Sequence, residues 1–543
     1  MSALSVSPLK LSERRATDIL FGVLYVVLAL ATFGILIHSS TAAGQKGTWD
    51  ALENCSMAPS APPSSPSPPQ SSHVAADLIG NLYFLAVPVF GAVALGCLWM
   101  ALLRYYAKPM VYATLVFKGV IMIGVGVYLY MTVKQSCTLT SGDCSAAYGP
   151  LVLCGAGLLY FLFLFCMRQR IELTAVLIEQ SVNVVSTHPA IFVASAGLLV
   201  VKIGVVCLCL ATYVTLFGSQ VMVAPSSAGT GGCDLDWQVT HADEFMYAVV
   251  TVFLYWSVQL WLSMRFYVVS LTTGVWYYQN ESLAAQEGSV GVDKVTSAPV
   301  CTSLKLAFTS SFGSIAFASL LIAICEYLKR LAQKERRNGG LIGCLIACCI
   351  TCILNYLEFL TRFALVFHAL TGDDFCTSGR TFLGHCSRHG FRVIMVDYLA
   401  AITLQFGAVI LALLVTALTV LLVKAGVYVH GDDMTTVLST YGAAAWFIGS
   451  LVLVFIAGIL LNVVDAAYAC LVLDLDNAAA TGAYRQPAMA QAVIAKAHPT
   501  YVIQQPSGSA AIGQPVYADY PQGRGHAYAQ QQAPPANRFY PNV

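Results

Sequence analysis

The ionisable residues that lie inside long apolar segments of this sequence include Lys118, Lys202, Asp397 and Asp465. A charged group at the centre of a bilayer costs at least ~2.5–3.5 kcal/mol, so such residues usually face protein or water rather than lipid. Two interpretations are open. Either the aspartates act as counter-ions for a cation or as proton-carrying groups, or each forms a structural ion pair with one of the two lysines.

Aromatic rings are concentrated in the segment around residues 245–271, where Tyr255 and Trp256 are followed one helical turn later by Gln259. A quaternary ammonium group cannot donate a hydrogen bond, so a site for it must use ring faces and carboxylates. The alternative is an interfacial aromatic belt, where Trp and Tyr normally collect. We predict that Tyr255, Trp256 and Gln259 bind the substrate, together with Asp397 and Asp465.

Other polar residues indicate structure more than chemistry. Glu358 and Arg362 are four positions apart, which predicts an ion pair on one helix face. A cysteine cluster at helical spacing could be acylated, bind metal or do neither; it comprises Cys344, Cys348, Cys349 and Cys352. A second Cys/His group matches no zinc-finger spacing, so no metal site is predicted; it comprises Cys376, His385, Cys386 and His389.

Motifs of enzymes are missing from the sequence. It has no hydrolase elbow, Walker A loop, HExxH or Rossmann fingerprint. We therefore predict no catalytic residue, no cofactor and no enzymatic activity.

The composition indicates whether the chain is surrounded by water or by lipid. Hydrophobic residues make up 57% of the 543 positions and charged residues 10%, and the mean hydropathy is +0.71. A soluble domain carries about 25% charged residues. The net charge of +1 is uninformative, and the absence of a basic stripe sets nucleic acid aside as a partner. The chain must therefore contact the lipid bilayer.

Apolar segments long enough to cross ~30 Å of hydrocarbon recur along the chain and predict an all-α polytopic membrane protein with about ten transmembrane helices. They lie at about 18–36, 80–103, 110–132, 149–167, 190–217, 245–271, 304–327, 341–370, 393–423 and 441–473. The segment 341–370, which carries Glu358 and Arg362, either spans or re-enters without crossing.

Basic residues orient these helices because they collect in cytoplasmic loops. Lys10, Arg14 and Arg15 predict a cytoplasmic N-terminus, and Arg104 with Lys108 fits a cytoplasmic turn. If every apolar segment crosses the membrane in turn, one basic group falls on the outer side, against this preference. Its members are Lys329, Arg330, Lys334, Arg336 and Arg337. We predict that both termini are cytoplasmic.

The predicted domain plan has three parts. Residues 1–17 form a cytoplasmic N-terminus, residues 18–475 the transmembrane domain, and residues 476–543 a disordered cytoplasmic tail too poor in aliphatic residues to fold alone. Within the transmembrane domain, residues 38–76 form an outer loop, and the spacing of apolar residues in 171–187 predicts an amphipathic helix at the cytoplasmic interface.

Oxidising surroundings predict modifications in the outer loops. Asn54 begins the sequon Asn54-Cys55-Ser56 and is a glycosylation candidate. Four outer cysteines, Cys55, Cys137, Cys144 and Cys233, allow three disulfide connectivities. Cys137 and Cys144 share one short loop, so their pairing is the least costly to close, and Cys55 with Cys233 would follow.

Several stretches together resemble the choline transporter-like family of solute carriers. They are RRATDILFGVLYVVL, RQRIELTAVLIEQSVNVVSTHPAIF, GSIAFASLLIAI, CLIACCITCILNYLEFL, FCTSGRTFLGHCSRHGFRVIMVD and VVDAAYACLVLDLD. Trp256 and the Trp276-Tyr277-Tyr278 cluster also stand at the separation of the family's sixth span. As a set, these blocks cover most of the chain.

This resemblance implies a ten-helix fold and facilitated or proton-coupled transport of choline, or of ethanolamine, across the plasma membrane or an organelle membrane. It also implies that the four-cysteine cluster is a family trait. Two residues depart from the family: Gln259 stands where some members carry a carboxylate, and Phe266 replaces a common glutamine. The alternative function from another class is a non-transporting membrane scaffold or adhesion protein.

Overall fold

The computed structural model describes residues 14–46, 86–139, 148–225, 233–237, 241–279, 298–338, 340–389, 391–426 and 433–481. Almost all of this part is helical, because a chain in lipid must satisfy its backbone hydrogen bonds within each segment. The predicted all-α polytopic class is confirmed. The bounds of the first helices are α1 Ile19–Lys46, α4 Ala86–Leu139, α5 Tyr148–Cys166, α6 Arg168–Thr187 and α7 Ala190–Gln220.

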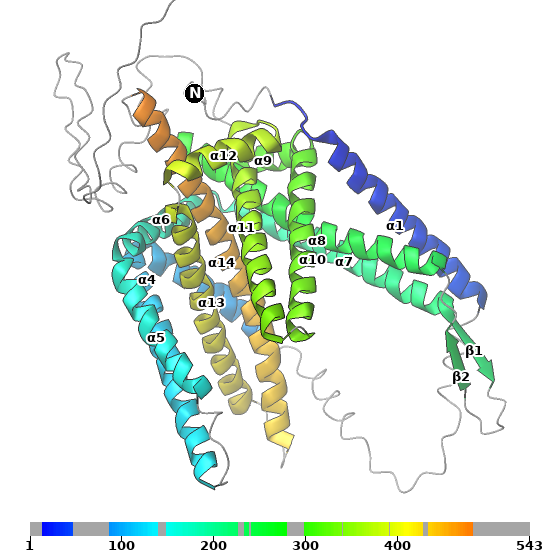
Figure 1. Cartoon of the computed structure of the whole chain (residues 1–543), viewed down its shortest axis with the longest axis horizontal. Coiled ribbons are helices and arrows are strands. Elements are labelled where there is room, and N and C mark those ends of the chain that lie inside the picture. The colour runs from blue at the N-terminus through cyan, green and yellow to red at the C-terminus, as the bar shows by residue number, and fades with distance from the viewer. Residues whose placement is uncertain are drawn as a thin grey trace, which may run out of the picture. The chain divides into compact units, whose positions relative to one another are not determined.

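The second half of the chain continues this plan (Figure 1). Its helices are α8 His241–Gln279, α9 Pro299–Phe308, α10 Phe312–Asn338, α11 Gly340–Thr371, α12 Phe375–His389, α13 Phe391–Gly426 and α14 Asp433–Thr481. Between α7 and α8, strands β1 (Val221–Pro225) and β2 (Cys233–Trp237) form an antiparallel hairpin, with Val221 opposite Trp237.

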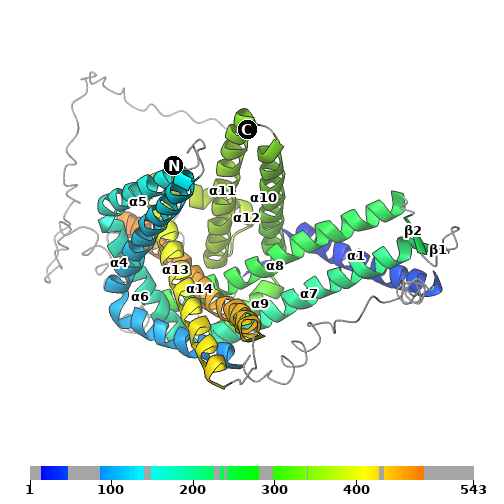
Figure 2. The same cartoon turned by 90° about the horizontal axis from the view of Figure 1, so that it is seen from below.

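Nine helices of the described chain are long and apolar enough to cross a membrane. One of them, α4, has 54 residues, or about 80 Å at 1.5 Å per residue, which exceeds two crossings of ~30 Å. It bends at Tyr106 (φ −127°, ψ 32°), three residues before Pro109. The two halves leave the bend in different directions (Figure 2), so α4 supplies two crossings and the total of about ten agrees with the prediction.

The structure differs from the predicted segments at two places. The segment predicted to begin at 304 is broken into α9 and α10, with turn residues Thr309, Ser310 and Ser311 between them. The residues after α11, which contain the second Cys/His group, form the amphipathic helix α12 between two predicted segments. Its first turn is capped by Asp374, whose Oδ2 accepts a hydrogen bond from the backbone N–H of Thr377 over 3.0 Å.

The segment 341–370, for which spanning and re-entry were both open, lies in α11, a single continuous helix of 32 residues. It is long and apolar enough to cross and runs beside α10 (Figures 1 and 2). On α10, Lys329 is buried between two carboxylates, Glu326 and Glu358. Part of the basic charge that disturbed the orientation rule is therefore neutralised inside the protein.

The short segment before α1 ties several helix ends together. Arg14 donates to the hydroxyl of Tyr267 on α8 (3.0 Å) and to the carbonyl of Ala369 on α11 (2.7 Å). Asp18 accepts hydrogen bonds from the Ser314 hydroxyl (2.5 Å) and the Phe375 N–H (3.2 Å). This segment thereby connects α8, α10, α11 and α12. Gly313 permits the approach, because a Cβ there would lie 2.4 Å from the carbonyl oxygens of Thr17 and Asp18.

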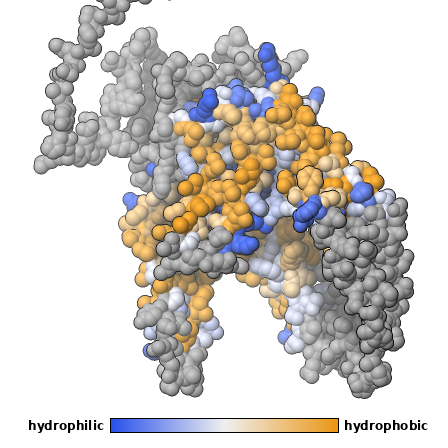
Figure 3. All heavy atoms as spheres, turned by 45° about the vertical axis from the view of Figure 1, so that its right-hand side comes forward, coloured by the Kyte–Doolittle hydropathy of each residue, from blue (hydrophilic) through white to orange (hydrophobic). Residues whose placement is uncertain are grey.

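The protein core is concentrated in the C-terminal halves of α8 and α14, where nearly every side chain is buried. Helix α6, which contains the segment 171–187, is also mostly buried and contacts α4, α13 and α14. By contrast, the earlier halves of α8 and α14 expose large apolar side chains such as Val252 and Phe447. Figure 3 shows hydrophobic residues covering much of the described surface on one face, as expected for a surface that meets lipid.

Candidate functional site

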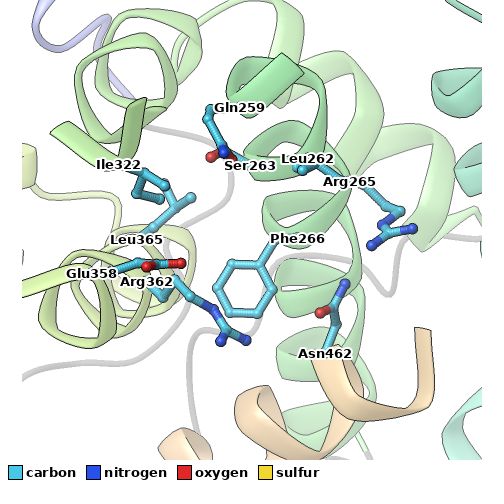
Figure 4. Close-up of a pocket in the computed structure, with 10 residues that line it drawn as sticks. All are labelled: Gln259, Leu262, Ser263, Arg265, Phe266, Ile322, Glu358, Arg362, Leu365 and Asn462. Carbon is cyan, nitrogen blue, oxygen red and sulfur yellow. The ribbon is translucent and has the colours of Figure 1, made fainter. Parts of the chain in front are cut away.

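A cavity of about 210 Å³ lies where α8, α10, α11 and α14 meet. Figure 4 shows its lining residues: Gln259, Leu262, Ser263, Arg265, Phe266, Ile322, Glu358, Arg362, Leu365 and Asn462. Four of the ten lining residues are apolar, and the other six carry an amide, a hydroxyl or a charged group. A small polar or charged organic molecule therefore matches the mixed character of this cavity.

Helix α8 provides half of the lining residues, and three of them share one face of the helix. Gln259, Ser263 and Phe266 are separated by four and three residues, so they follow one stripe of the helix. The Phe266 ring projects into the cavity (Figure 4). The guanidinium of Arg362 lies over that ring, 5.3 Å from its centroid.

Arg362 joins the cavity to a buried acid. Its Nη2 donates to Oδ2 of Asp465 on α14 over 2.8 Å, and the Asp465 side chain is 1% exposed while that of Arg362 is 30% exposed. The carboxyl group of Asp397 on α13 is close enough to interact with Asp465 and with Arg362. Two carboxylates beside one guanidinium leave one negative charge in excess, unless a proton or cation binds.

Glu358 has a different ion-pair partner from the one predicted. It accepts a hydrogen bond from Nζ of Lys329 on α10, which also donates to Glu326 over 3.1 Å. The ion pair predicted between Glu358 and Arg362 is wrong, because the Lys329 ammonium group on α10 pairs with Glu358 and the Asp465 carboxylate on α14 pairs with Arg362. The Glu358 side chain is still 27% exposed and faces the cavity.

The two lysines predicted as structural partners do not pair with the aspartates. Within the described residues, Lys118 forms no ion pair, and its Nζ lies 5.7 Å from the centroid of the Tyr160 ring. Lys202 is half-buried near Arg265. The predicted lysine pairing is therefore wrong. Asp465 pairs with Arg362 instead, and the role of the aspartates in binding a cation or a proton stays a prediction.

Trp256 lies in a helix contact and is not one of the residues that line the cavity. It is 2% exposed, and its Nε1 donates to the Ala316 carbonyl (3.1 Å) and the Ser319 hydroxyl (3.0 Å) on α10. Its ring also meets the edge of Tyr25 on α1, with centroids 5.4 Å apart. These contacts give Trp256 a packing role, and its predicted binding role stays a prediction.

Tyr255 points toward α10. Its hydroxyl accepts a hydrogen bond from Arg330 Nη1 over 2.9 Å, and the Arg330 guanidinium lies 5.0 Å from its ring centroid. Of the five predicted binding residues, only Gln259 lines the cavity. Asp465 and Asp397 reach it indirectly, through Arg362.

Sequence reasoning missed Arg265 and Asn462. Arg265 is an ionisable residue inside a predicted span, so the cost of placing a charge in the bilayer, which drew attention to Asp397 and Asp465, applies to it equally. Asn462 lies three positions before Asp465, on the same face of α14. Neither residue belongs to a recognisable motif, and the cavity alone brings them together.

The predicted modification sites lie beyond what the structure describes. Asn54, Cys55 and Cys144 fall outside the described residues. The side chains of Cys137 and Cys233 are also outside the description. Glycosylation and the disulfide pairing therefore stay predictions.

Comparison with known proteins places the chain among transporters. A family described as plasma-membrane choline transporter matches residues 151–476, a range that contains every residue lining the cavity. A CTL-like protein of Dictyostelium discoideum is 24% identical over 502 residues, which cover 86% of each chain. Protein PNS1 of Cryptococcus neoformans is 27% identical over 61% of this chain and 57% of its own length.

An animal relative is also similar over part of the chain. The choline transporter-like protein 5 of Macaca fascicularis is 24% identical over 292 residues, or 48% of this chain and 41% of the relative. The family match thus covers the helices that form the cavity, and the similarity to the Dictyostelium protein extends over most of the sequence.

Proposed function

The chain belongs to the choline transporter-like family, a family of multi-pass membrane transporters and not of enzymes, and from that premise we propose that it carries choline, or a related small organic cation such as ethanolamine, across the plasma membrane or an organelle membrane. The observation that carries the proposal is the cavity inside the membrane-spanning helices. It offers the three kinds of group that such a molecule needs: a ring face, a carboxylate and an amide.

Each group has a role that follows from its chemistry. The face of Phe266 attracts a quaternary ammonium through its negative π-surface. Glu358 supplies negative charge without being fully consumed by Lys329, since part of its side chain stays open to the cavity. Gln259 can orient the hydroxyl group of choline. Because Arg362 is held by Asp465, it adds little repulsion toward a bound cation.

Uptake of radiolabelled choline and ethanolamine into proteoliposomes tests the proposal. We expect uptake above that of empty vesicles, saturating with concentration. Leu262→Trp, which fills the cavity from α8, should abolish it. Val252→Trp introduces the same side chain at a 53% exposed position of the same helix and should leave uptake intact. Uptake no higher than in empty vesicles, for both solutes, favours the alternative of a non-transporting scaffold or adhesion protein.

One observation favours proton coupling over simple facilitated transport. The Asp397, Asp465 and Arg362 cluster carries one negative charge in excess, and Asp397 Oδ1 and Asp465 Oδ1 are buried without a hydrogen-bond partner in the described part of the chain. A proton would neutralise the excess. Glu358 on α11 also interacts with Arg362, and Arg265 on α8 is the remaining charged residue that lines the same cavity.

An imposed pH gradient across the proteoliposome membrane separates the two modes. We expect the gradient to stimulate choline uptake by the wild-type protein. Asp397→Asn should keep basal uptake and lose the stimulation. Wild-type uptake that is indifferent to the gradient would instead indicate facilitated transport.

A further inference from the structure

Arg265 is the charged residue of the cavity that forms no ion pair with another described residue. It belongs to α8 and is one of the residues that line the cavity, where it lies on the same side as Asn462 (Figure 4), and its Nε is buried without a hydrogen-bond partner. No carboxylate lies within ion-pair distance of it among the described residues. Its guanidinium carbon lies 5.9 Å from the centroid of the Phe455 ring, and Lys202 adds a second positive charge nearby.

The other charges of the cavity are already matched. Arg362 is bound to Asp465, and Glu358 is bound to Lys329. Arg265 therefore adds to the cavity a positive charge that forms no ion pair among the described residues. A buried cation without a counter-ion is costly in a membrane interior. An arrangement of this kind is expected where a bound anionic group completes the ion pair.

Arg265 lies apart from the other charged lining residues. In Figure 4, Arg265 and Asn462 lie on one side of the Phe266 ring, and Glu358 lies on the other together with Arg362, whose charge is offset by Asp465. Arg265 presents N–H donors in a fork that matches a carboxylate or phosphate, and the Asn462 amide can donate beside it. The opposite side offers a carboxylate and the ring face. The cavity thus has one end suited to an anion and one suited to a cation.

We propose that the preferred ligand of this cavity is a zwitterion, an organic cation that also carries a carboxylate or phosphate group, with Arg265 binding the anionic group. This inference rests on the proposed function, because it assigns the substrate class of the same cavity. A bare cation such as choline occupies only one end and leaves Arg265 without a counter-ion. A trimethylammonium compound with an acidic group fills both ends.

Binding of three probes to the full-length protein tests the inference. Choline, glycine betaine and phosphocholine share the trimethylammonium group, and only the last two carry an acidic group. In nanodiscs of phosphatidylglycerol, which has no choline headgroup, we expect at least one zwitterion to bind roughly tenfold tighter than choline, the gain of a charge-assisted hydrogen bond. Equilibrium competition against radiolabelled ligand gives the ratio.

Variants of Arg265 identify the group responsible. Arg265→Gln should weaken binding of the preferred zwitterion roughly tenfold and leave choline binding unchanged or improved. Arg265→Lys keeps the charge without the fork and should fall between. Arg104→Gln is the matched control, because Arg104 is exposed on α4 and outside the cavity; it should leave the ratio unchanged. The wild-type ratio needs no variant, so a poorly folding Arg265 variant does not block the test.

The source of the zwitterion can also be distinguished. If nanodiscs of phosphatidylcholine weaken zwitterion binding to the wild-type protein but not to Arg265→Gln, the site accepts lipid headgroups; if they have no effect, it accepts free solutes. Both results support a zwitterion site. A wild-type protein that binds choline as tightly as both zwitterions, or an Arg265→Gln variant with the wild-type ratio, overturns the inference. Choline uptake with no zwitterion preference refutes this inference alone, whereas no uptake of any probe refutes the proposed function as well.

Discussion

Nη2 of Arg362 donates to Oδ2 of Asp465 over 2.8 Å, and this contact joins α11 to α14 beneath the cavity. The acid is buried and the guanidinium is partly open to the cavity. The pair therefore holds one wall of the candidate site in place and sets the charge that a ligand meets there. It also brings Asp397 on α13 into the same cluster.

Removal of Arg362 should destabilise the protein more than removal of a surface ion pair. Arg362→Gln leaves two acids without their guanidinium, and breaking a buried pair from one side costs ~3–5 kcal/mol. We expect a lower melting temperature by several degrees. Lys108→Gln is the control, because the Lys108–Glu172 pair (2.6 Å) is exposed and such pairs contribute about 0–1 kcal/mol. Equal losses in the two variants would contradict a central role for the buried pair.

Trp256→Ala separates packing from binding. The structure predicts a lower melting temperature, since the variant loses both hydrogen bonds to α10 and a buried ring, typically ~3–5 kcal/mol. The sequence-based hypothesis of a ring cage predicts in addition a roughly tenfold loss of choline affinity. Trp256→Phe should lose less of either. Affinity and melting temperature measured on the same preparations decide between the two roles.

Gln259 should contribute to recognition of a hydroxyl group. It lines the cavity beside Ser263, and choline has a hydroxyl where tetramethylammonium has none. We expect Gln259→Ala to bring the two affinities closer by roughly fivefold, about one hydrogen bond. Ser181→Ala, in buried α6 and away from the cavity, serves as the control. An unchanged ratio in Gln259→Ala would place the hydroxyl elsewhere.

The cap of α12 should make stability depend on pH in acid. The hydrogen bond from Thr377 holds the pKa of the Asp374 carboxyl below its ordinary value. A depressed pKa means that the stabilisation is fully present above the unfolded-state pKa of about 3.9 and is lost as the pH falls through the folded-state value. We expect the wild type to melt higher than Asp374→Ala at pH 6 and this gap to close toward pH 3. A gap independent of pH would show that the carboxylate charge is not needed.

The outer disulfide prediction can be tested by chemistry. We expect non-reducing peptide mapping to recover Cys137 linked to Cys144, because their loop is the shortest to close. Cys209, which is buried in α7 and has no disulfide partner, should be recovered as a free thiol in the same digest. Free Cys137 would overturn the predicted connectivity.

The family and the helical class followed from the sequence because they depend on local properties. Long apolar segments such as those in α7 and α13 must become helices wherever the solvent is lipid, whatever their neighbours are. The bend of α4 was also readable, because Arg104 and Lys108 interrupt an apolar run that is too long for one crossing. The ring-bearing face of α8 was recognised, and Gln259 on it lines the cavity.

What the sequence by itself determined is therefore which segments meet lipid and which residues are costly to bury. Which charges meet was decided by tertiary structure alone. Glu358 and Arg362 are helical neighbours, yet Lys329 and Asp465 approach them from other helices and take them as partners. Trp256 and Phe266 are both aromatic residues of α8, and the rotation of that helix against α10 buries the first in a contact and turns the second into the cavity. Spacing along one chain specifies a helix face, but the partner of that face is chosen by packing between helices far apart in sequence.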